Sequence, residues 1–213
     1  MDNVLIVGAS SDIAKAVVLL LDRPGRTILA HYHESLHKVE SLRHGLRGEL
    51  LPIRADLADV EQVQGLIGQA MPYEPDKILF LASPRIAAIR FRQLTWDDFS
   101  YQLDVGLHST VSILQAFLPV MAKKKSGKVV LTLSSSTLNV PPAVFAHYVT
   151  AKYALLGLAK ALSSEYRRHG ININAVSPSM VETEFLRDLP DKMIEFAAEQ
   201  HPAGRNARPK DIA

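Results

Sequence analysis

The 213-residue sequence contains no cysteine, so disulfide bonds, thiolate catalysis and cysteine-ligated zinc sites are all excluded. It opens without a basic segment leading into an apolar core, so we predict no signal peptide. The longest apolar run near the N-terminus, Ala16–Leu21, is too short to span a bilayer. The eight histidines show no metal-ligand spacing, and a formal charge of +2 gives no reason to expect nucleic acid. We therefore expect a cytoplasmic protein that binds neither a metal, a membrane nor nucleic acid.

No repeat, low-complexity tract or linker divides the chain, so we expect one domain spanning residues 1–213. Short apolar runs alternate with longer amphipathic stretches, which predicts an α/β fold: a Rossmann-type doubly wound parallel sheet with helices on both faces, in three αβα layers. The expected strands are Val4–Val7, Thr27–Tyr32, Leu50–Arg54, Ile78–Ala82, Val129–Leu133 and a run from Ile171. The expected helices are Asp12–Leu21, Leu36–His44, Val60–Met71, Phe99–Lys123 and one carrying Tyr148. In such a sheet the ligand binds at the carboxyl ends of the strands.

Tyr148 and Lys152 are four residues apart on a predicted helix, so they lie on one face, one turn apart. An ammonium beside a phenol favours the phenolate and lowers the tyrosine pKa from about 10. Lowering that pKa to about 7 requires roughly 4 kcal/mol, after which the phenol could exchange a proton with an alcohol near neutral pH. Alone, the pair is weak evidence of function, because the same spacing usually marks only a helix surface.

The surroundings of the pair are more specific. The chain opens with Val4–Ser11, a strand-like run leads into Ser134–Ser136 upstream of Tyr148, and a second run, Ile171–Pro178, follows the helix. In this order and spacing the sequence resembles the short-chain dehydrogenase/reductase family over nearly all of its length, especially the branch containing 3-oxoacyl-carrier-protein reductases. The resemblance implies hydride transfer between a nicotinamide cofactor and a carbonyl or secondary alcohol, with a small-molecule or carrier-bound substrate such as a 3-oxoacyl thioester.

The resemblance also implies a catalytic set. Tyr148 gives its proton to the developing alkoxide, Lys152 lowers the pKa of Tyr148 and holds the ribose, and a serine hydrogen-bonds the reacting oxygen. Counting from Gly127 selects Ser134 as that serine, whereas counting back from Tyr148 selects Ser135, and one extra residue within 137–146 would explain the conflict. We predict Ser135, because both hydroxyls must reach one carbonyl oxygen.

The cofactor contacts implied by the resemblance lie at the ends of several strands. They are Gly8, Ser10, Ser11, Ile13, His33, Asp56, Leu57, Ala82, Ser83, Tyr148, Lys152, Pro178, Val181 and Thr183. Gly8 permits the tight turn, the following helix N-terminus meets phosphate, Asp56-Leu57 holds adenine and Thr183 holds the nicotinamide. No aspartate stands near Tyr32 to accept from a ribose 2′-hydroxyl, so we predict NADP as cofactor, with NAD still able to bind.

Four departures from the family pattern accompany these matches. Asp12 and Ala14 replace two glycines of the first turn, residues 81–84 replace an Asn-Asn-Ala-Gly segment, Gly106 replaces an asparagine linked to the proton relay, and Ser179 replaces a glycine. We interpret Asp12 as a helix-start residue pointing away from the ligand. The departures support a second hypothesis, an inactive nucleotide- or partner-binding relative. The intact Ser, Tyr, Lys and Thr set favours the enzyme.

The resemblance extends to assembly. It implies a homodimer or homotetramer, with an interface between the helix Phe99–Lys123 and the Tyr148 helix. We interpret Lys123–Lys125 and Arg167-Arg168 as cations at helix ends, the alternative being a patch for an acidic carrier protein. The stretch from Arg205 resembles the start of an element that a further helix and a seventh strand follow in relatives. Either the sequence continues beyond Ala213, which we favour, or a six-stranded sheet has an exposed edge.

Overall fold

The computed structural model describes residues 2–138 and 140–213, and in these residues six parallel strands form one sheet of order β3-β2-β1-β4-β5-β6. The strands are β1 Val4–Val7, β2 Thr27–Tyr32, β3 Glu49–Arg54, β4 Lys77–Phe80, β5 Gly127–Thr132 and β6 Ile171–Val176. The helices are α1 Asp12–Leu21, α2 Leu36–Ser41, α3 Val60–Ala70, α4 Trp96–Leu103, α5 Ser109–Lys124, α6 Ala146–Tyr166, α7 Asp191–Gln200 and α8 Pro209–Ile212. The doubly wound α/β prediction is confirmed.

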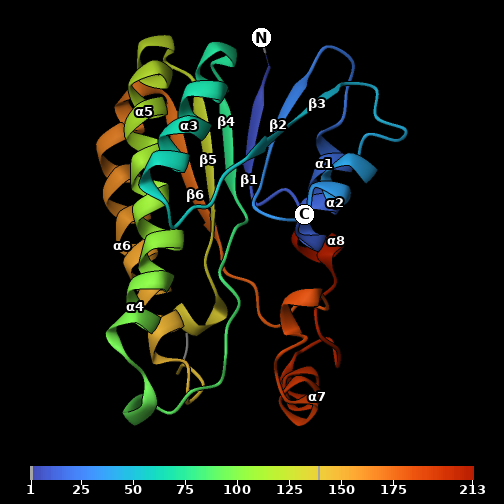
Figure 1. Cartoon of the computed structure of the whole chain (residues 1–213), viewed down its shortest axis with the longest axis vertical. Coiled ribbons are helices and arrows are strands. Elements are labelled where there is room, and N and C mark those ends of the chain that lie inside the picture. The colour runs from blue at the N-terminus through green and yellow to red at the C-terminus, as the bar shows by residue number, and fades with distance from the viewer. Residues whose placement is uncertain (1, 139) are drawn as a thin grey trace.

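The sheet is covered on both faces, with α3, α5 and α6 on one side and α1 and α2 on the other (Figure 1). Strand β1 explains the arrangement, because its four residues are all buried and alternate between the faces. Leu5 and Val7 belong to the core beneath α3 and α5, whereas Val4 and Ile6 pack with α1 and α2. A continuous apolar run is what a parallel strand buried on both faces requires.

The long helix expected at Phe99–Lys123 is present but interrupted. A π-helical turn, η3 (Asp104–His108), separates α4 from α5. The whole stretch Trp96–Lys124 is long and apolar enough to cross a membrane by length and composition. Its inward side chains, including Ile113 and Phe117, are fully buried in the sheet core, which accounts for that composition.

Strand β4 ends at Phe80, two residues earlier than expected. The N–H groups of Leu81 and Ala82 both donate to the Val7 carbonyl, at 2.8 and 2.9 Å, so the chain leaves the strand and closes over the end of β1. Because β1 and β4 are neighbours whose chains turn to opposite sides, this point is the topological switch of the sheet.

The segment after β6 folds back along the carboxyl edge and reaches α1. Val181 pairs with Ala207 in an isolated parallel bridge, and α7 and α8 lie beyond the carboxyl ends of the strands (Figure 1). The opposite edge carries the basic runs, since Lys123–Lys125 end one residue before β5 and Arg167-Arg168 end two residues before β6. Lys124 pairs there with Glu74 at 2.6 Å. This position supports the helix-end interpretation over a carrier patch beside the site.

Candidate active site

Tyr148 and Lys152 lie near the start of α6 on one face, as predicted. The Lys152 Nζ lies 5.5 Å from the centroid of the Tyr148 ring, within cation–π range, and donates to the Thr132 carbonyl at 2.9 Å. Thr132 is the last residue of β5, so the ammonium joins the helix to the end of that strand. Lys152 is 5% exposed, which is unusual for a lysine and indicates a specific role.

The expected lowering of the tyrosine pKa is contradicted. Burial raises the pKa of Tyr148 above 10, and a hydrogen bond with the Ser134 side chain offsets part of that rise. Burial lowers the pKa of Lys152 to about 8. The reason is geometric: the ammonium lies over the ring and is directed to the Thr132 carbonyl, while desolvation penalises both charged forms.

The serine whose side chain acts on the Tyr148 phenol in the structure is Ser134, whereas the spacing favoured Ser135 and left Ser134 as the alternative. Ser134 has extended backbone (φ −157°, ψ 150°) and continues the direction of β5, and its side chain reaches Tyr148. Ser135 begins the turn η4 (Ser135–Thr137), where its N–H donates to the Pro178 carbonyl at 2.8 Å. Position 139, within the stretch where spacing suggested an extra residue, lies outside the described residues.

The turn after β1, which we expect to meet the cofactor, packs tightly around Gly8. Its φ of +92° lies in the left-handed region, and a Cβ there would stand 2.5 Å from the Ala82 nitrogen, so only glycine fits. The Gly8 N–H donates to the His31 Nδ1 at 3.0 Å. Ser11 caps α1 by accepting from the Ala14 N–H at 3.2 Å, and its hydroxyl proton stays available to a phosphate. Ser10 and Ile13 flank this cap and are partly buried.

Asp12 begins α1, as predicted, and its carboxylate has a partner in the chain. Its Oδ2 accepts from the Glu184 N–H at 2.9 Å, in the turn η6 (Glu184–Leu186). The Glu184 side chain in turn pairs with Lys38 of α2 at 2.6 Å. The Asp12 carboxylate, whose charge is unfavourable beside a phosphate, thus joins the loop after β6 to the start of α1 through a hydrogen bond.

The residues expected at the adenosine end of the cofactor lie at the ends of β2 and β3. The His33 Nε2 lies 3.7 Å from the Asp56 Oδ2, and the Asp56 Oδ1 accepts from the Ala58 N–H at 2.9 Å. Leu57 is buried in the main core. Sequence reasoning missed Arg54, whose Nε donates to the His33 carbonyl at 3.3 Å. The strand register that pairs Tyr32 with Arg54 brings this cation to the end of β2, and no local pattern reveals it.

On the other side of the switch point, buried hydroxyls face the ends of β4 and β5. Among the described residues, the Ser83 and Ser136 hydroxyls are buried without a hydrogen-bond partner. Pro178, Val181 and Thr183 follow β6, with the Thr183 hydroxyl donating to the Val181 carbonyl at 3.1 Å. A glycine turn that admits no side chain and unpaired hydroxyls along the same edge fit a polar dinucleotide. We therefore take these residues as suited to NAD(P).

Gly106 lies in the π-turn and leaves space. A Cβ there would meet nothing closer than Leu155 Cδ1 at 3.9 Å. A cavity of about 10 Å³ adjoins it, bounded also by Thr110 and Thr132, which is about the room one water needs. Where the family pattern has an asparagine, this chain therefore has a small cavity beside Thr132, whose carbonyl accepts the hydrogen bond from Lys152.

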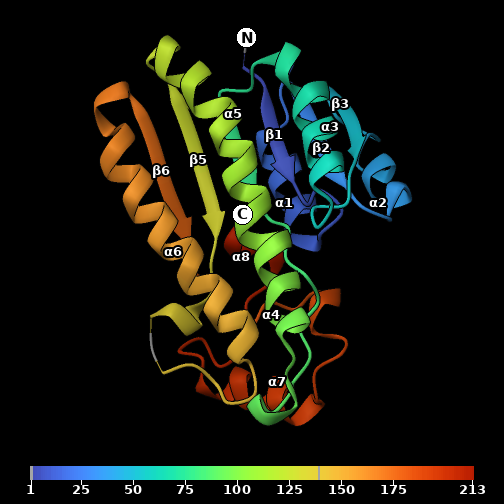
Figure 2. The same ribbon diagram turned by 60° about the vertical axis from the view of Figure 1, so that its left-hand side comes forward.

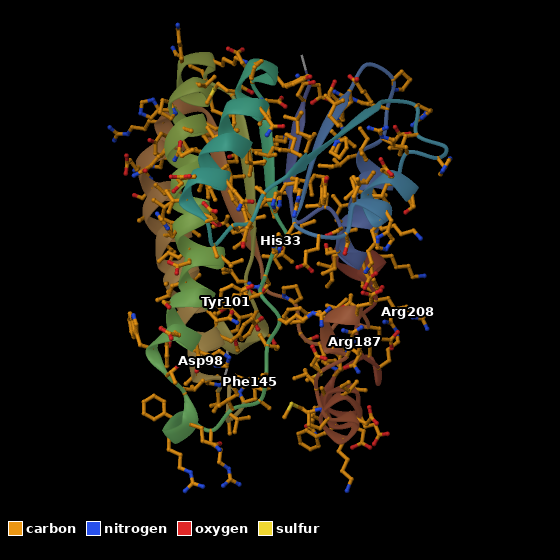
Figure 3. All side chains as sticks on the ribbon, in the orientation of Figure 1. His33, Asp98, Tyr101, Phe145, Arg187 and Arg208 are labelled. Carbon is orange, nitrogen blue, oxygen red and sulfur yellow. The ribbon has the colours of Figure 1, made fainter. Side chains whose placement is uncertain are left out.

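An apolar cluster covers Tyr148. Ile86, Phe145, Leu186 and Leu189 are buried together, and Tyr148 packs against them. Phe145 comes from the loop before α6, and Arg187 projects from the segment after β6 (Figure 3). Tyr148 therefore packs against apolar side chains contributed by three separate segments.

Within residues 2–138 and 140–213, no three histidine, aspartate or glutamate side chains gather as a metal site.

A family model described as enoyl-(acyl carrier protein) reductase matches residues 8–213. The 3-oxoacyl-[acyl-carrier-protein] reductase FabG of Thermotoga maritima is 26% identical over 215 residues, covering 98% of this chain and 86% of that protein. The oxidoreductase UcpA of Salmonella typhimurium is 25% identical over 218 residues, covering 98% and 83%.

Solved structures agree with these matches. A 3-oxoacyl (acyl-carrier-protein) reductase from Agrobacterium tumefaciens C58 with NADP bound superimposes with a TM-score of 0.88 at 26% identity, covering 99% of this chain and 84% of that one. A 3-oxoacyl-[acyl-carrier protein] reductase with bound NAD from Brucella melitensis gives 0.83 at 25% identity, covering 99% and 80%. The chain belongs to the short-chain dehydrogenase/reductase family and is an NAD(P)H-dependent oxidoreductase.

Proposed function

We propose that the protein interconverts a carbonyl and a secondary alcohol at Tyr148. The observation that carries this proposal is the gathering of three groups at the end of β5: the Ser134 side chain acts on the Tyr148 phenol, and Lys152 lies over the Tyr148 ring and donates to the Thr132 carbonyl. When bound, the nicotinamide supplies or accepts the hydride at the substrate carbon. Tyr148 then donates the proton that converts the developing alkoxide to an alcohol, and the Ser134 hydroxyl holds the same oxygen.

The state of the proton donor follows from the burial of the pair. Tyr148 is partly buried, and a phenol whose pKa is raised stays protonated, so it serves as the acid for carbonyl reduction. Lys152, with its pKa lowered to about 8, exchanges protons near neutral pH and can restore the proton of the phenol. Both side chains would also meet the nicotinamide ribose.

The serine assignment is tested by comparing Ser134→Ala with Ser135→Ala. Loss of one donor to the reacting oxygen lowers turnover by about 10²-fold. We expect that loss for Ser134→Ala, with Ser135→Ala within a few-fold of wild type. A larger loss of turnover in Ser135→Ala than in Ser134→Ala would assign the contact with the reacting oxygen to Ser135.

The proposed cofactor preference is NADPH over NADH. The end of β2 has no carboxylate at Tyr32, and His33 and Arg54 place an imidazole and a guanidinium cation there. A 2′-phosphate gains charge-assisted hydrogen bonds from such groups. Arg54→Gln should weaken NADPH binding and leave NADH binding unchanged, and equal losses for both would remove this explanation.

For the substrate, we propose a 3-oxoacyl thioester on a small molecule or a carrier. The apolar cluster over Tyr148 suits an acyl chain. Arginines 85, 90 and 92 lie on the loop after β4, all exposed, and the N–H of Ile89 in that loop donates to the Val144 carbonyl next to the site. Such a basic rim suits an acidic carrier, and the names of the relatives point the same way.

The rival function is nucleotide or partner binding without turnover, favoured by Gly106, Asp12 and the Ser83 segment. The deciding experiment titrates NADPH and NADH and then, at saturating cofactor, assays a panel of 3-oxoacyl thioesters, ketones and sugars. Turnover of any carbonyl that is lost in Tyr148→Phe supports the enzyme. Tight cofactor binding with no turnover across the panel supports the rival.

We further propose a cytoplasmic homodimer or homotetramer that associates through the long helix and α6. Figure 2 shows α5 and α6 as two long helices with β5 and β6 visible between them, and α4 approaching the start of α6. Tyr101 and Tyr153 on these helices are about half exposed, as interface aromatics are before association. Light scattering at micromolar concentration tests this, and a monomer would contradict it.

A further inference from the structure

His31 is buried at the centre of the cofactor edge and uses all of its hydrogen-bonding groups. Its Nδ1 accepts from the Gly8 N–H at 3.0 Å, so Nδ1 is unprotonated and the proton is on Nε2. The Nε2 lies 3.0 Å from the Ala55 carbonyl, to which it donates. The His31 carbonyl accepts from the Ala9 N–H at 2.7 Å. One residue therefore joins the ends of β1, β2 and β3.

The three segments that His31 joins are those expected to hold the cofactor. Gly8 and Ala9 form the turn before α1, and Ala55 immediately precedes Asp56-Leu57 at the adenine end. Burial lowers the pKa of His31 to about 4, which keeps Nδ1 free as an acceptor across the working pH range. A neutral imidazole is the group that can accept from one segment and donate to the other at once.

The hydrogen bond from the Gly8 N–H to His31 affects how a dinucleotide can bind to this turn. A glycine-turn N–H that has an acceptor inside the protein is not free to bind phosphate, so the turn is already held in shape by the chain. We propose that His31 is a positioning residue that takes the place of the ligand at the Gly8 N–H and preorganises the phosphate turn against the adenine segment. Preorganisation of this kind increases affinity by reducing the ordering cost of binding.

Two amide variants separate this role from simple space filling. In His31→Asn the side-chain oxygen occupies the Nδ1 position and can accept from Gly8, whereas in His31→Gln the amide lies near the Nε2 position and reaches only Ala55. We expect His31→Asn to bind NADPH within about 3-fold of wild type and His31→Gln to bind it 10- to 100-fold more weakly. The turnover number at saturating NADPH should stay within about 3-fold for both, because His31 does not touch the reacting atoms.

His44→Gln, an exposed histidine in the turn after α2, serves as the matched control and should match wild type. Equal affinity of the Asn and Gln variants, whether both bind tightly or both bind weakly, would overturn the proposal. If neither variant folds, amide hydrogen exchange of the wild-type protein decides. The Gly8 amide should be protected at pH 7 before NADPH is added. An amide that becomes protected only on adding NADPH would assign the acceptor role to the ligand instead of His31.

Discussion

The two halves of the sheet differ in whether their buried polar groups have hydrogen-bond partners within the chain. At the ends of β1–β3, both His31 nitrogens are bonded, the Ser11 side chain caps α1 and the Asp12 carboxylate holds the Glu184 N–H. At the ends of β4–β6, in the part of the chain that the structure describes, the buried Ser83 and Ser136 hydroxyls and the His147 Nδ1 have no partner. In the first half these groups are paired within the chain, whereas in the second half some of the buried groups are left without a partner.

This difference follows the division of labour expected of the site. A binding surface gains affinity when it is already in shape, whereas a catalytic surface must offer its donors to a reacting molecule. Buried groups without partners cost folding free energy, and such costs concentrate at functional sites. Perturbing the first half should therefore change stability and cofactor affinity, and perturbing the second should change turnover.

The largest expected effect is on turnover in the second half. Tyr148→Phe keeps the ring in the apolar cluster and removes the proposed proton donor, so kcat should fall by about 10³-fold or more. The dissociation constant of NADPH should change little. Stopped-flow kinetics and a fluorescence titration measure the two quantities. Near-wild-type turnover in this variant would show that another group is the acid.

The next effect is on stability in the first half. Gly8→Ala forces a side chain into left-handed backbone 2.5 Å from the Ala82 nitrogen, which should cost about 3 kcal/mol or more. The matched control is Gly68→Ala in α3, where a Cβ meets nothing within 4 Å and helix propensity predicts a gain of about 1 kcal/mol. Urea denaturation measures both. A mild Gly8→Ala variant would mean that the turn is not rigid.

Acid should also destabilise the first half selectively. The pKa of His31 is lowered from 6.5 in the unfolded chain to about 4, so the unfolded state binds more protons as pH falls between these values. Stability present above pH 6.5 is then lost, by about 2 kcal/mol at pH 5. His33 and Asp56 face the ring and act in opposite directions on its pKa. His31→Asn should flatten the decline in unfolding free energy between pH 7.5 and 5, and an unchanged decline would assign it to other groups.

The sequence predicted the part of the fold that local patterns determine. Strands β1 and β2 begin and end where the apolar runs do, and Ser11-Asp12 marks the start of α1. The π-turn around Gly106 was missed, because one extra residue in a helical turn leaves the apolar spacing on both sides nearly unchanged. The fold class was predictable for the same reason: alternating strands and helices permit few arrangements.

The site was less predictable, because its details depend on contacts between distant segments. Ser134 or Ser135 could be chosen only by knowing where the chain leaves β5. His31 contacts Gly8 across 23 positions, and Asp12 contacts Glu184 across 172, so neither partner is marked by a local motif. Burial, which reverses the expected direction of the Tyr148 pKa, is likewise a property of the packed chain.

The smallest expected effect is on NADPH binding when Asp12 is changed, because Asp12 joins the first half of the sheet to the loop after β6. The Asp12 carboxylate stands at the helix N-terminus expected to receive phosphate, which it repels, and it also fastens the loop after β6 through Glu184. Asp12→Asn removes the charge and keeps an oxygen to accept the Glu184 N–H, whereas Asp12→Ala removes both. We expect the Asp12→Asn variant to bind NADPH about 2- to 3-fold more tightly than wild type at low salt. The difference should shrink at 0.5 M salt, because the Debye length there is roughly 4 Å and the repulsion between carboxylate and phosphate is screened. Alanine should bind more weakly than asparagine at either salt, and only alanine should speed hydrogen exchange of the Glu184 amide. Tighter binding by wild type than by asparagine at low salt would mean that the carboxylate helps to hold the cofactor, and the first half would then share the ligand-directed character of the second.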